Sequence, residues 1–425
     1  MSSDSGLCCV YPEDDQWLQV HRAVADGFGI VSIGDDLGAR DHLRPAERRV
    51  ALIDQHSAER PVVGGAFAYA FDMSLPGGAR VPVAGLGGVS ISPVAQGRGG
   101  LPQLIATHLQ QSLDAGDAAS VLMASESGLY QRYGYGLATE MAEWHLQTRE
   151  YQLLGPVNDN ITIRLIHDRS QAAELLHRVY ETAVNARQGG IHRSPDWWPL
   201  VLNDDEHSWF GNGPEFVAVA FSGNTPCGYA LYKLRGRPDT ASGHGRVSQQ
   251  VVVSELIAPD IEAELVLFNY LSKLAMVREL LWAVAPVDPP VRHFMRDPRQ
   301  LWQRVRTDMM WLRPLDLPML FTSIEYHEDG DILIDYRDPQ FESLCQVWRL
   351  TVAGGAARME KCDRAVLDTE SHVALDSAAL GNVILGTTRV IELARVGKVS
   401  GSEAGVRQFD CLLRFDQTPF NVNKF

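Results

Sequence analysis

The feature that most constrains the fold of this sequence is a strand–proline–turn–helix unit that occurs twice. The first copy, residues 88–105, is GVSISPVAQGRGGLPQLI, and the second, residues 252–271, is VVSELIAPDIEAELVLFNYL. Each begins as an apolar strand, meets a proline (Pro93 or Pro259), turns briefly and continues as a helix. Two units of the same order predict an internal duplication, although two βα units can also resemble each other by chance. The alternation of strands and helices around them predicts an α/β fold.

The segments that flank each copy follow a similar plan. Before the first copy, Pro12 opens a predicted helix with acidic residues in its first turn, and residues 76–80, PGGAR, join two predicted strands. Before the second copy, residues 161–166 are typical of a strand and residues 170–187 of a helix, with a further pair of strands after them. The order of elements therefore repeats along the chain.

Domain boundaries follow from shifts in composition. Residues 151–160, YQLLGPVNDN, have the glycine, proline and asparagine content of a linker. The pattern changes again near residue 306, and Asp329-Gly330 predicts a hairpin beyond it. Because 425 residues are too many for one core, we predict three domains, at 1–150, 151–305 and 306–425.

Charge and composition exclude several classes of protein. The net charge of −15 argues against nucleic acid as the main partner. We expect no membrane span, because no run of about 18 uncharged apolar residues occurs, and no signal peptide, because the N-terminus is acidic. The six cysteines form no CxxC pair and fit reduced thiols in the cytoplasm. His327, Glu328, Asp329 and Asp331 are better explained by turn chemistry than by a metal site, and we expect no metal.

The turn of the first copy has the chemistry of a phosphate-binding site. Gln96, Gly97, Arg98, Gly99 and Gly100 stand directly before a predicted helix. The first backbone N–H groups of a helix are unpaired and attract anions, and glycine lets a phosphate approach the backbone. A glycine-rich helix entry without a ligand explains this turn alone equally well. A P-loop would need Gly-Lys-Ser/Thr, and the glycine spacing does not fit a dinucleotide fold.

A wider set of motifs identifies a family. Strand, proline and Gln/Arg-x-x-Gly-x-Gly/Ala before a helix resemble the acetyl-CoA motif of GCN5-related N-acetyltransferases, with Leu101 in place of the last Gly or Ala. Together with VPVAGLGGVSISP, ASESGLYQRYGYG, a degenerate second unit and a final Phe425, the chain resembles the Eis (enhanced intracellular survival) acetyltransferases over its whole length.

This resemblance implies a fold and an activity. It implies an α/β (α+β) protein with two tandem acetyltransferase-like domains, the first active and the second degenerate, and a C-terminal domain similar to sterol carrier proteins. It also implies an acetyl-CoA-dependent N-acetyltransferase that assembles as a hexamer. Asp260, Glu262 and Glu264 in the second turn would repel a pyrophosphate, so one coenzyme A (CoA) is expected per chain.

The resemblance also assigns the site residues. Tyr130 is the acid that protonates the departing CoA thiolate, and the carboxylate of Phe425 handles the amine. Tyr133 and Tyr135 are expected to pack against the cofactor or the core. The expected cofactor-binding residues are Val89, Ser90, Ile91, Gln96, Gly97, Arg98, Gly99, Gly100, Leu101 and Ser125.

The acceptor is not fixed by the sequence. An aminoglycoside-type polyamine is the family default, and another amine, such as a polyamine, a lysine side chain or a metabolite, is the alternative. Asp35, Asp36 and Asp41 fit a solvated loop better than a substrate-facing one. A non-catalytic lipid-binding protein, acting through the third domain, remains a different class of function.

Overall fold

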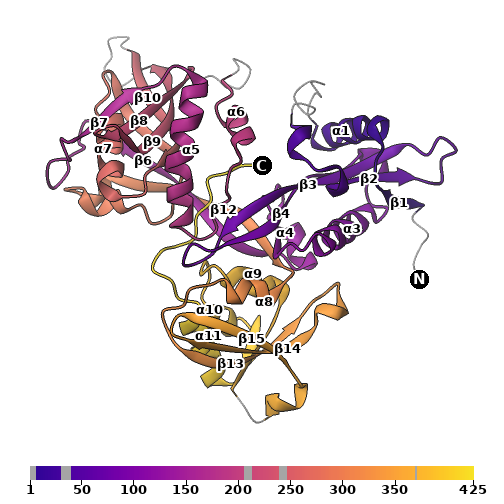
Figure 1. Ribbon diagram of the computed structural model, residues 1–425. Coiled ribbons are helices and arrows are strands. Elements are labelled where there is room, and N and C mark those ends of the chain that lie inside the picture. Colours follow the sequence, from indigo (N-terminus) through magenta and orange to yellow (C-terminus); the bar gives the residue numbers. More distant parts are fainter. Residues whose placement is uncertain (1–5, 30–39, 205–212, 239–246, 369–370) are drawn as a thin grey trace. The chain divides into compact units, whose positions relative to one another are not determined.

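The computed structural model describes residues 6–29, 40–204, 213–238, 247–368 and 371–425 (Figure 1). The chain forms two compact units. The first contains residues 1–138, 310–416 and 424–425, and the second contains residues 139–309 and 417–423.

The first unit begins with a sheet in the order β1-β2-β3-β4-β5-β12. Its strands are β1 (Leu7–Val10), β2 (Arg49–Asp54), β3 (Val62–Ser74), β4 (Arg80–Ile91), β5 (Ala119–Leu122) and β12 (Leu301–Pro314), whose last residues pair with β5. Its helices are α1 (Asp14–Phe28), α3 (Gly100–Asp114) and α4 (Ser127–Tyr130), with short 3₁₀ turns at Asp41–Leu43, Ala46–Arg48, Pro93–Ala95 and Gln131–Tyr133. Helices α1 and α3 cover opposite faces of the sheet (Figure 1).

The sequence patterns of this sheet form the elements that they predict. The predicted helix after Pro12 is α1, and the PGGAR segment joins β3 to β4, which pair antiparallel from Gly64–Ile91 to Ser74–Arg80. Gly77 and Gly78 in that turn have φ of 91° and 85°, a region that favours glycine. On the α3 face, Leu104, Ile105 and Leu109 pack against residues of β2, β3 and β4 to form the core.

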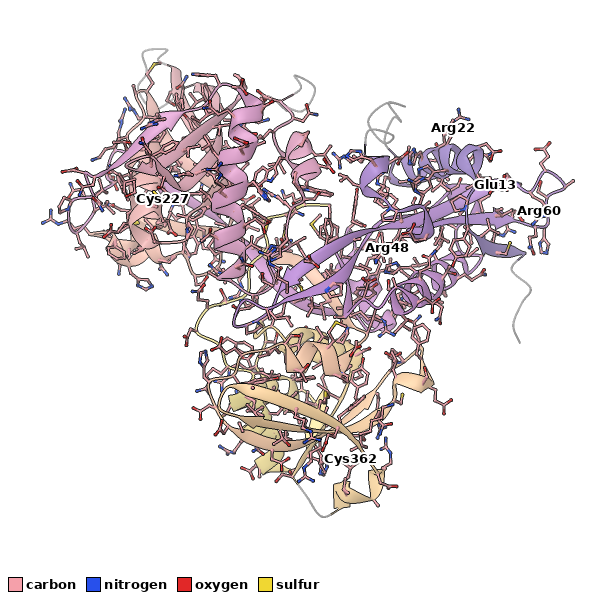
Figure 2. The ribbon with its side chains drawn as sticks, viewed as in Figure 1. Glu13, Arg22, Arg48, Arg60, Cys227 and Cys362 are labelled. Carbon is pink, nitrogen blue, oxygen red and sulfur yellow. The ribbon has the colours of Figure 1, made fainter. Side chains whose placement is uncertain are left out.

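A largely buried ion pair connects the starts of two strands of this sheet. Arg48, labelled in Figure 2, donates two hydrogen bonds to the carboxylate of Asp117, at 2.8 and 3.0 Å. Asp117 lies just before β5, and only 3% of it is exposed. The pair therefore ties the start of β2 to the start of β5.

The rest of the first unit is a five-stranded sheet in the order β15-β14-β13-β16-β17. Its strands are β13 (Gly330–Arg337), β14 (Gln346–Ala353), β15 (Ala356–Cys362), β16 (His372–Asp376) and β17 (Val399–Gly401). Its helices are α8 (Leu317–Thr322), α9 (Ser377–Val383), α10 (Val390–Arg395) and α11 (Glu403–Leu412), with 3₁₀ turns at Glu342–Leu344 and Arg364–Asp368.

The predicted hairpin around Asp329-Gly330 is wrong. Asp316 caps α8 through the N–H of Met319, and Pro318 lies in the first turn. Helix α8 ends at Thr322 and a loop follows it, so the described residues just before this dipeptide form no strand. Gly330 begins β13, and the hairpin turn lies at Gly354-Gly355, between β14 and β15. The Asp329 carboxylate accepts a hydrogen bond from the Gly354 N–H, so its turn chemistry serves that later hairpin.

The strands of the second unit lie in the order β6-β11-β10-β9-β8-β7. Its strands are β6 (Gly136–Gln147), β7 (Ile161–Leu165), β8 (Glu215–Ser222), β9 (Thr225–Pro238), β10 (Val247–Ile257) and β11 (Val277–Ala285). Its helices are α5 (Arg169–Asn185), α6 (Trp198–Val201) and α7 (Ile261–Ser272), with 3₁₀ turns at Pro195–Trp197, Pro290–Phe294 and Pro298–Gln300. Parallel β10 and β11 stand as β4 and β5 do in the first unit.

All six cysteines are free thiols, and Cys227 and Cys362 are labelled in Figure 2. Among the described residues, no helix is long and apolar enough to cross a membrane.

Candidate active site

The glycine turn of the first unit leaves the start of α3 open. Gly97 and Gly99 have φ of 75° and 80°, and a Cβ added to either would meet no atom of the described residues within 4 Å. Gly99 is the N-cap of α3, and within the described residues no side chain caps this end. Gly100 differs, because its Cβ would lie 2.5 Å from the Leu52 Cδ2. Two glycines therefore keep the helix end accessible to an anion, and the third lets the helix pack on the sheet.

Arg98 has a partner that the sequence did not indicate. Its guanidinium donates to both carboxylate oxygens of Asp54 at the end of β2, at 2.5 and 2.9 Å. This hydrogen-bonded pair lowers the pKa of Asp54 to about 2. Arg98 was expected to offer its charge to phosphate, but in the structure it braces the turn against β2. Gln96 likewise turns back, and its amide donates to the carbonyl of Ile91 at 3.3 Å.

Strand β4 runs beyond the end of its pairing with β5 before it reaches this turn, and residues 87–91 are called its separated part. Val83–Leu86 pair in parallel with Ala119–Leu122, and beyond Leu86 no pairing between these two strands continues among the described residues. On its other edge β4 stays paired with β3 as far as Ile91, across an irregularity beside Phe67. Val89, Ser90 and Ile91, the predicted cofactor-binding segment, lie on the separated part. Ser125 is exposed just after β5, on the other side of the separation.

Tyr130 ends α4 and is almost completely buried. Only 6% of it is exposed, and its ring packs edge-on against Tyr135, with centroids 5.9 Å apart. Burial, with a smaller contribution from Glu126, raises the pKa of Tyr130 to about 12, so the phenol stays protonated at neutral pH. Tyr133 and Tyr135 belong to the same apolar cluster, as predicted.

A row of hydrogen-bonded, buried polar side chains fixes the hydroxyl of Tyr135. Its hydroxyl lies 2.8 Å from the Ser120 hydroxyl, which lies 2.7 Å from the Nε2 of His108 on α3. Burial, Arg48 and Arg313 lower the pKa of His108 to about 3, so its ring is neutral. This chain of hydrogen bonds links α3 and β5 to residues 130–138, and no sequence motif indicated it.

Phe425 packs on the first sheet. Its ring lies against Phe71 and Tyr69 of β3, with centroid separations of 5.1 and 6.3 Å. A Cβ on Gly85 of β4 would lie 2.6 Å from the Phe71 ring and 3.2 Å from the Phe425 ring, so glycine leaves room for both rings. The chain end therefore lies on the sheet that carries the glycine turn.

A polar cluster surrounds Tyr69 next to the Phe425 ring. Arg44 donates two hydrogen bonds to the Tyr69 hydroxyl, both at 3.1 Å, and its side chain is 2% exposed. Asp41 lies 3.4 Å from Arg44 and 3.3 Å from the Nε2 of His21. Asp41 is thus engaged and only 28% exposed, which corrects the prediction of a solvated side chain. Asp35 and Asp36 lie outside the described residues.

The corresponding turn of the second unit is closed by its own side chains. Asp260 caps α7 by accepting from the Ala263 N–H at 2.9 Å, and the Glu264 carboxylate accepts from Val291 N–H at 3.2 Å. Burial raises the pKa of Glu264 to about 7, so near neutral pH it carries only part of a negative charge. Of the three acids expected to repel a pyrophosphate, Glu264 therefore repels it less than a fully charged carboxylate would. Asp260 also caps the start of α7, where a pyrophosphate would have to bind.

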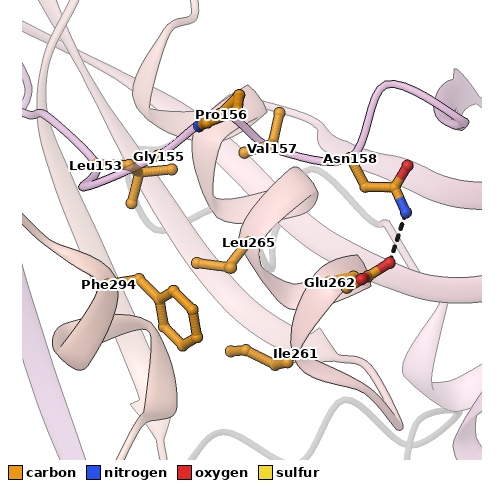
Figure 3. Close-up of a pocket in the computed structure, with 9 residues that line it drawn as sticks. All are labelled: Leu153, Gly155, Pro156, Val157, Asn158, Ile261, Glu262, Leu265 and Phe294. Atoms are coloured by element: carbon orange, nitrogen blue, oxygen red, sulfur yellow. Dashed lines mark hydrogen bonds between the residues drawn. The ribbon is translucent and has the colours of Figure 1, made fainter.

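A cavity of about 410 Å³ lies beside this first turn of α7 (Figure 3). Figure 3 shows that the Glu262 carboxylate accepts a hydrogen bond from the Asn158 amide, and the distance is 2.5 Å. Most of the other walls are apolar: Leu153, Pro156, Val157, Ile261, Leu265 and Phe294. Apolar walls and a carboxylate at the helix end do not suit a pyrophosphate.

Comparison with protein families assigns each part of the chain. Residues 11–138 and 189–314 each match a family described as acetyltransferase (GNAT) domain, and residues 317–422 match the sterol carrier protein domain.

Two full-length relatives are N-acetyltransferases. An uncharacterized N-acetyltransferase of Streptomyces coelicolor is 26% identical over 395 residues, 92% of each chain. The N-acetyltransferase Eis of Mycobacterium tuberculosis is 26% identical over 423 residues, 96% of this chain and 98% of Eis.

Solved structures have the same fold. Eis1 from Mycobacterium abscessus superimposes with a TM-score of 0.82 at 24% identity, covering 99% of this chain and 100% of Eis1. A GCN5-related N-acetyltransferase from Kribbella flavida gives 0.77 at 23% identity, covering 99% and 98%. Two acetyltransferase domains followed by a sterol-carrier-like domain are therefore the architecture of this chain, as the sequence predicted.

Proposed function

Because the chain belongs to the Eis group of GCN5-related N-acetyltransferases, enzymes whose co-substrate is acetyl-CoA, we propose that its first acetyltransferase domain acetylates a small-molecule amine. The observation that carries this proposal is the open, glycine-lined start of α3 beside the separated end of β4. Pyrophosphate would bind at the helix end, and the thioester would lie along the free edge of β4.

The proposed reaction is direct transfer. The amine nitrogen attacks the thioester carbonyl carbon. The C–S bond breaks, CoA leaves as a thiolate, and the acetyl group stays on the nitrogen as an amide. Backbone N–H groups near Val89–Ile91 stabilise the oxyanion that forms. Tyr130 gives its proton to the departing thiolate, and the phenolate regains a proton from water.

The energetics of this proton transfer depend on how dry the site is. A phenol of pKa about 12 is roughly 3.5 units weaker than a free thiol, a cost of ~5 kcal/mol. The dry surroundings that raise the pKa of the phenol also disfavour a thiolate. They therefore raise the pKa of the CoA thiol and reduce the difference between the two pKa values. Tyr130 therefore suits a site closed to water, where the leaving thiolate needs the proton most.

We propose that the Phe425 carboxylate holds the incoming amine. A free carboxylate titrates about 7 units below an alkyl ammonium, so it cannot strip the proton alone, a gap of roughly 9 kcal/mol. It orients the ammonium, and the proton of the ammonium leaves through water. The contacts of the Phe425 ring with Phe71 and Tyr69 support this role, because they hold the chain end on the first sheet.

The acceptor is an amine, and the charges near Phe425 favour one with few positive charges. Arg44 is buried against Tyr69, the ring neighbour of Phe425, and Asp41 is already engaged by Arg44 and His21. The Arg44–Asp41 ion pair has no net charge, so it offers a polycation no electrostatic attraction. This observation favours a monoamine, such as a metabolite or a lysine side chain, over an aminoglycoside-type polyamine.

The test is acetyl-CoA turnover, read as free thiol, with a panel of aminoglycosides, polyamines, simple monoamines and lysine peptides. We expect turnover with at least one monoamine and a lower kcat/KM with polycations. No turnover with any amine, combined with tight binding of a lipid, would instead favour the lipid-binding alternative.

Three other features stay predictions. The domain limits at residues 150 and 305 and a cytoplasmic location rest on sequence composition, and a hexameric assembly is implied by the family resemblance.

A further inference from the structure

The segment that follows Tyr130 rests on a helix of the sterol-carrier-like domain. A Cβ on Gly136, at the start of β6, would lie 2.1 Å from the carbonyl of Ala378 and 2.5 Å from the N of Asn382. A Cβ on Gly381 would in turn lie 2.2 Å from the carbonyl of Leu312 and 2.9 Å from the N of Gly136. All of these neighbours are backbone atoms, so the main chain of α9 lies directly against the main chain at Gly136.

Hydrogen bonds fix this contact. The Leu137 N–H donates to the Oδ1 of Asn382 at 3.0 Å, and the Asn382 amide donates to the carbonyl of Ala378 at 2.7 Å. The hydroxyl of Thr387 donates to the carbonyl of Ala138. One side chain, Asn382, therefore satisfies a strand end and a helix carbonyl together.

A buried ion pair closes the same junction. Arg313 of β12 donates to Asp338 of the sterol-carrier-like domain at 2.8 Å, and both side chains are completely buried. A Cβ on Gly134, which has φ of 84°, would lie 2.3 Å from the Arg313 Nη1. Phe341, three residues beyond Asp338, packs against the cluster that contains Tyr130 and Tyr135.

We propose that the sterol-carrier-like domain positions the catalytic tyrosine: α9, through Asn382 and Gly381, fixes the main chain of residues 134–138 and thereby the place of the Tyr130 phenol. The proposal rests on the proposed role of Tyr130 as the acid. It gives the third domain a task in the reaction that needs no lipid. Because proton transfer depends on sub-ångström placement, a loosened Tyr130 slows chemistry without weakening CoA binding.

The test uses three variants of the full chain. Asn382→Ala removes the acceptor for Leu137. Asn382→Asp keeps an oxygen that can accept this N–H, but its second oxygen faces the Ala378 carbonyl, to which the Asn382 amide donates. The control is Asp376→Ala, which removes the cap at the start of α9, a bond from the Ala379 N–H at 2.8 Å. The control weakens the same helix without touching residues 134–138.

We expect Asn382→Ala to lower kcat by about 10- to 100-fold, with the affinity for CoA and the KM for acetyl-CoA unchanged. Asn382→Asp should recover part of kcat, because it restores the acceptor for Leu137 but not the donor to Ala378. Asp376→Ala should lower Tm but leave kcat near the wild-type value. If kcat instead falls with Tm alike in Asn382→Ala and Asp376→Ala, the contact is only structural and the proposal is overturned.

A double variant separates this inference from the proposed function. Added to Tyr130→Phe, Asn382→Ala should cost no further activity, because the group that it positions is already gone. Additive losses would show that Asn382 does not act through Tyr130. If Tyr130→Phe is slow while Asn382→Ala has full activity, only the positioning role fails. If Tyr130→Phe itself has full activity, the proposed acid fails and the positioning role falls with it.

Discussion

The two acetyltransferase domains share one unit of strand, proline, turn and helix, but they differ in whether side chains cap the start of the helix. In the first domain, Gly97 and Gly99 leave the start of α3 uncapped among the described residues. In the second, Asp260 caps α7, and Glu262 accepts a hydrogen bond from Asn158. A helix start binds an anion only while its N–H groups are free, so one capping residue is enough to close it while the fold persists.

The strands before these turns differ in the same sense. Glu255 stands four residues before Pro259, as Val89 stands four before Pro93. The Glu255 carboxylate accepts from Arg193 at 2.6 and 3.0 Å and from the Tyr229 hydroxyl at 2.8 Å, all buried. Buried pairs of this kind are costly to break. The second domain therefore has a structural ion pair where the first has the proposed cofactor-binding segment.

The largest expected effect is on CoA binding. We expect Gly99→Glu to abolish it, because the new carboxylate would sit where phosphate must approach and the backbone there has φ of 80°. Gly99→Asn is the control for backbone strain, since asparagine tolerates this conformation, and should retain weaker binding. Titration calorimetry of the wild type should give one CoA per chain. A stoichiometry of two, or unchanged affinity in Gly99→Glu, would contradict the contrast between the domains.

The next effect is on chemistry alone. Tyr130→Phe should lower kcat by about 10²- to 10⁴-fold with little change in CoA affinity, since a general acid acts in the transition state. The segment after β11 that corresponds to it, residues 286–296, contains no tyrosine, so the second domain cannot replace it. The readout is thiol release at saturating acetyl-CoA, and full activity in Tyr130→Phe would place the acid elsewhere.

A smaller effect is expected at the chain end. A short C-terminal tag keeps the Phe425 ring but turns its carboxylate into an amide, and deletion of Phe425 removes both. We expect each change to lower kcat by about 10²-fold with CoA binding intact. Within the second unit, Arg193 donates to Asn423 at 2.9 Å, so the residues just before the chain end are anchored and not frayed. A C-terminally tagged protein as active as an N-terminally tagged one would remove this role.

The order of elements could be predicted because it depends on local patterns. Apolar runs, Pro93 and Pro259, and the PGGAR turn specify strands, turns and helix starts without distant partners. The hairpin at Asp329-Gly330 failed because the same dipeptide also suits a loop before a strand. The glycine turn was located, but the partner of Arg98 was not, since Asp54 lies 44 residues away.

Contacts between distant segments are what the sequence could not supply. Asn382 meets Leu137 across 245 residues, and Arg44 reaches Tyr69 across 25. A single Asn or Arg at such a position looks like any surface residue until the chain has folded. The family resemblance pointed to Tyr130 and Phe425, but only the structure shows what surrounds them.

The smallest expected effect concerns stability and pH in the second domain. Burial raises the pKa of Glu264 from 4.5 to about 7, so between these pH values the folded state holds a proton that the unfolded state has lost. Stability of this region therefore falls as pH rises from about 4.5 to about 7, by at most ~3 kcal/mol.

Glu264→Gln should remove this dependence, because its amide oxygen can still accept from the Val291 N–H without becoming charged. Glu262→Gln, at an exposed position of the same helix, is the control and should change little. Hydrogen exchange of the α7 amides, corrected for the intrinsic pH dependence, gives the local free energy of opening. Equal pH dependence in wild type and Glu264→Gln would show that Glu264 is charged throughout, and pyrophosphate repulsion by all three acids would then stand as first predicted.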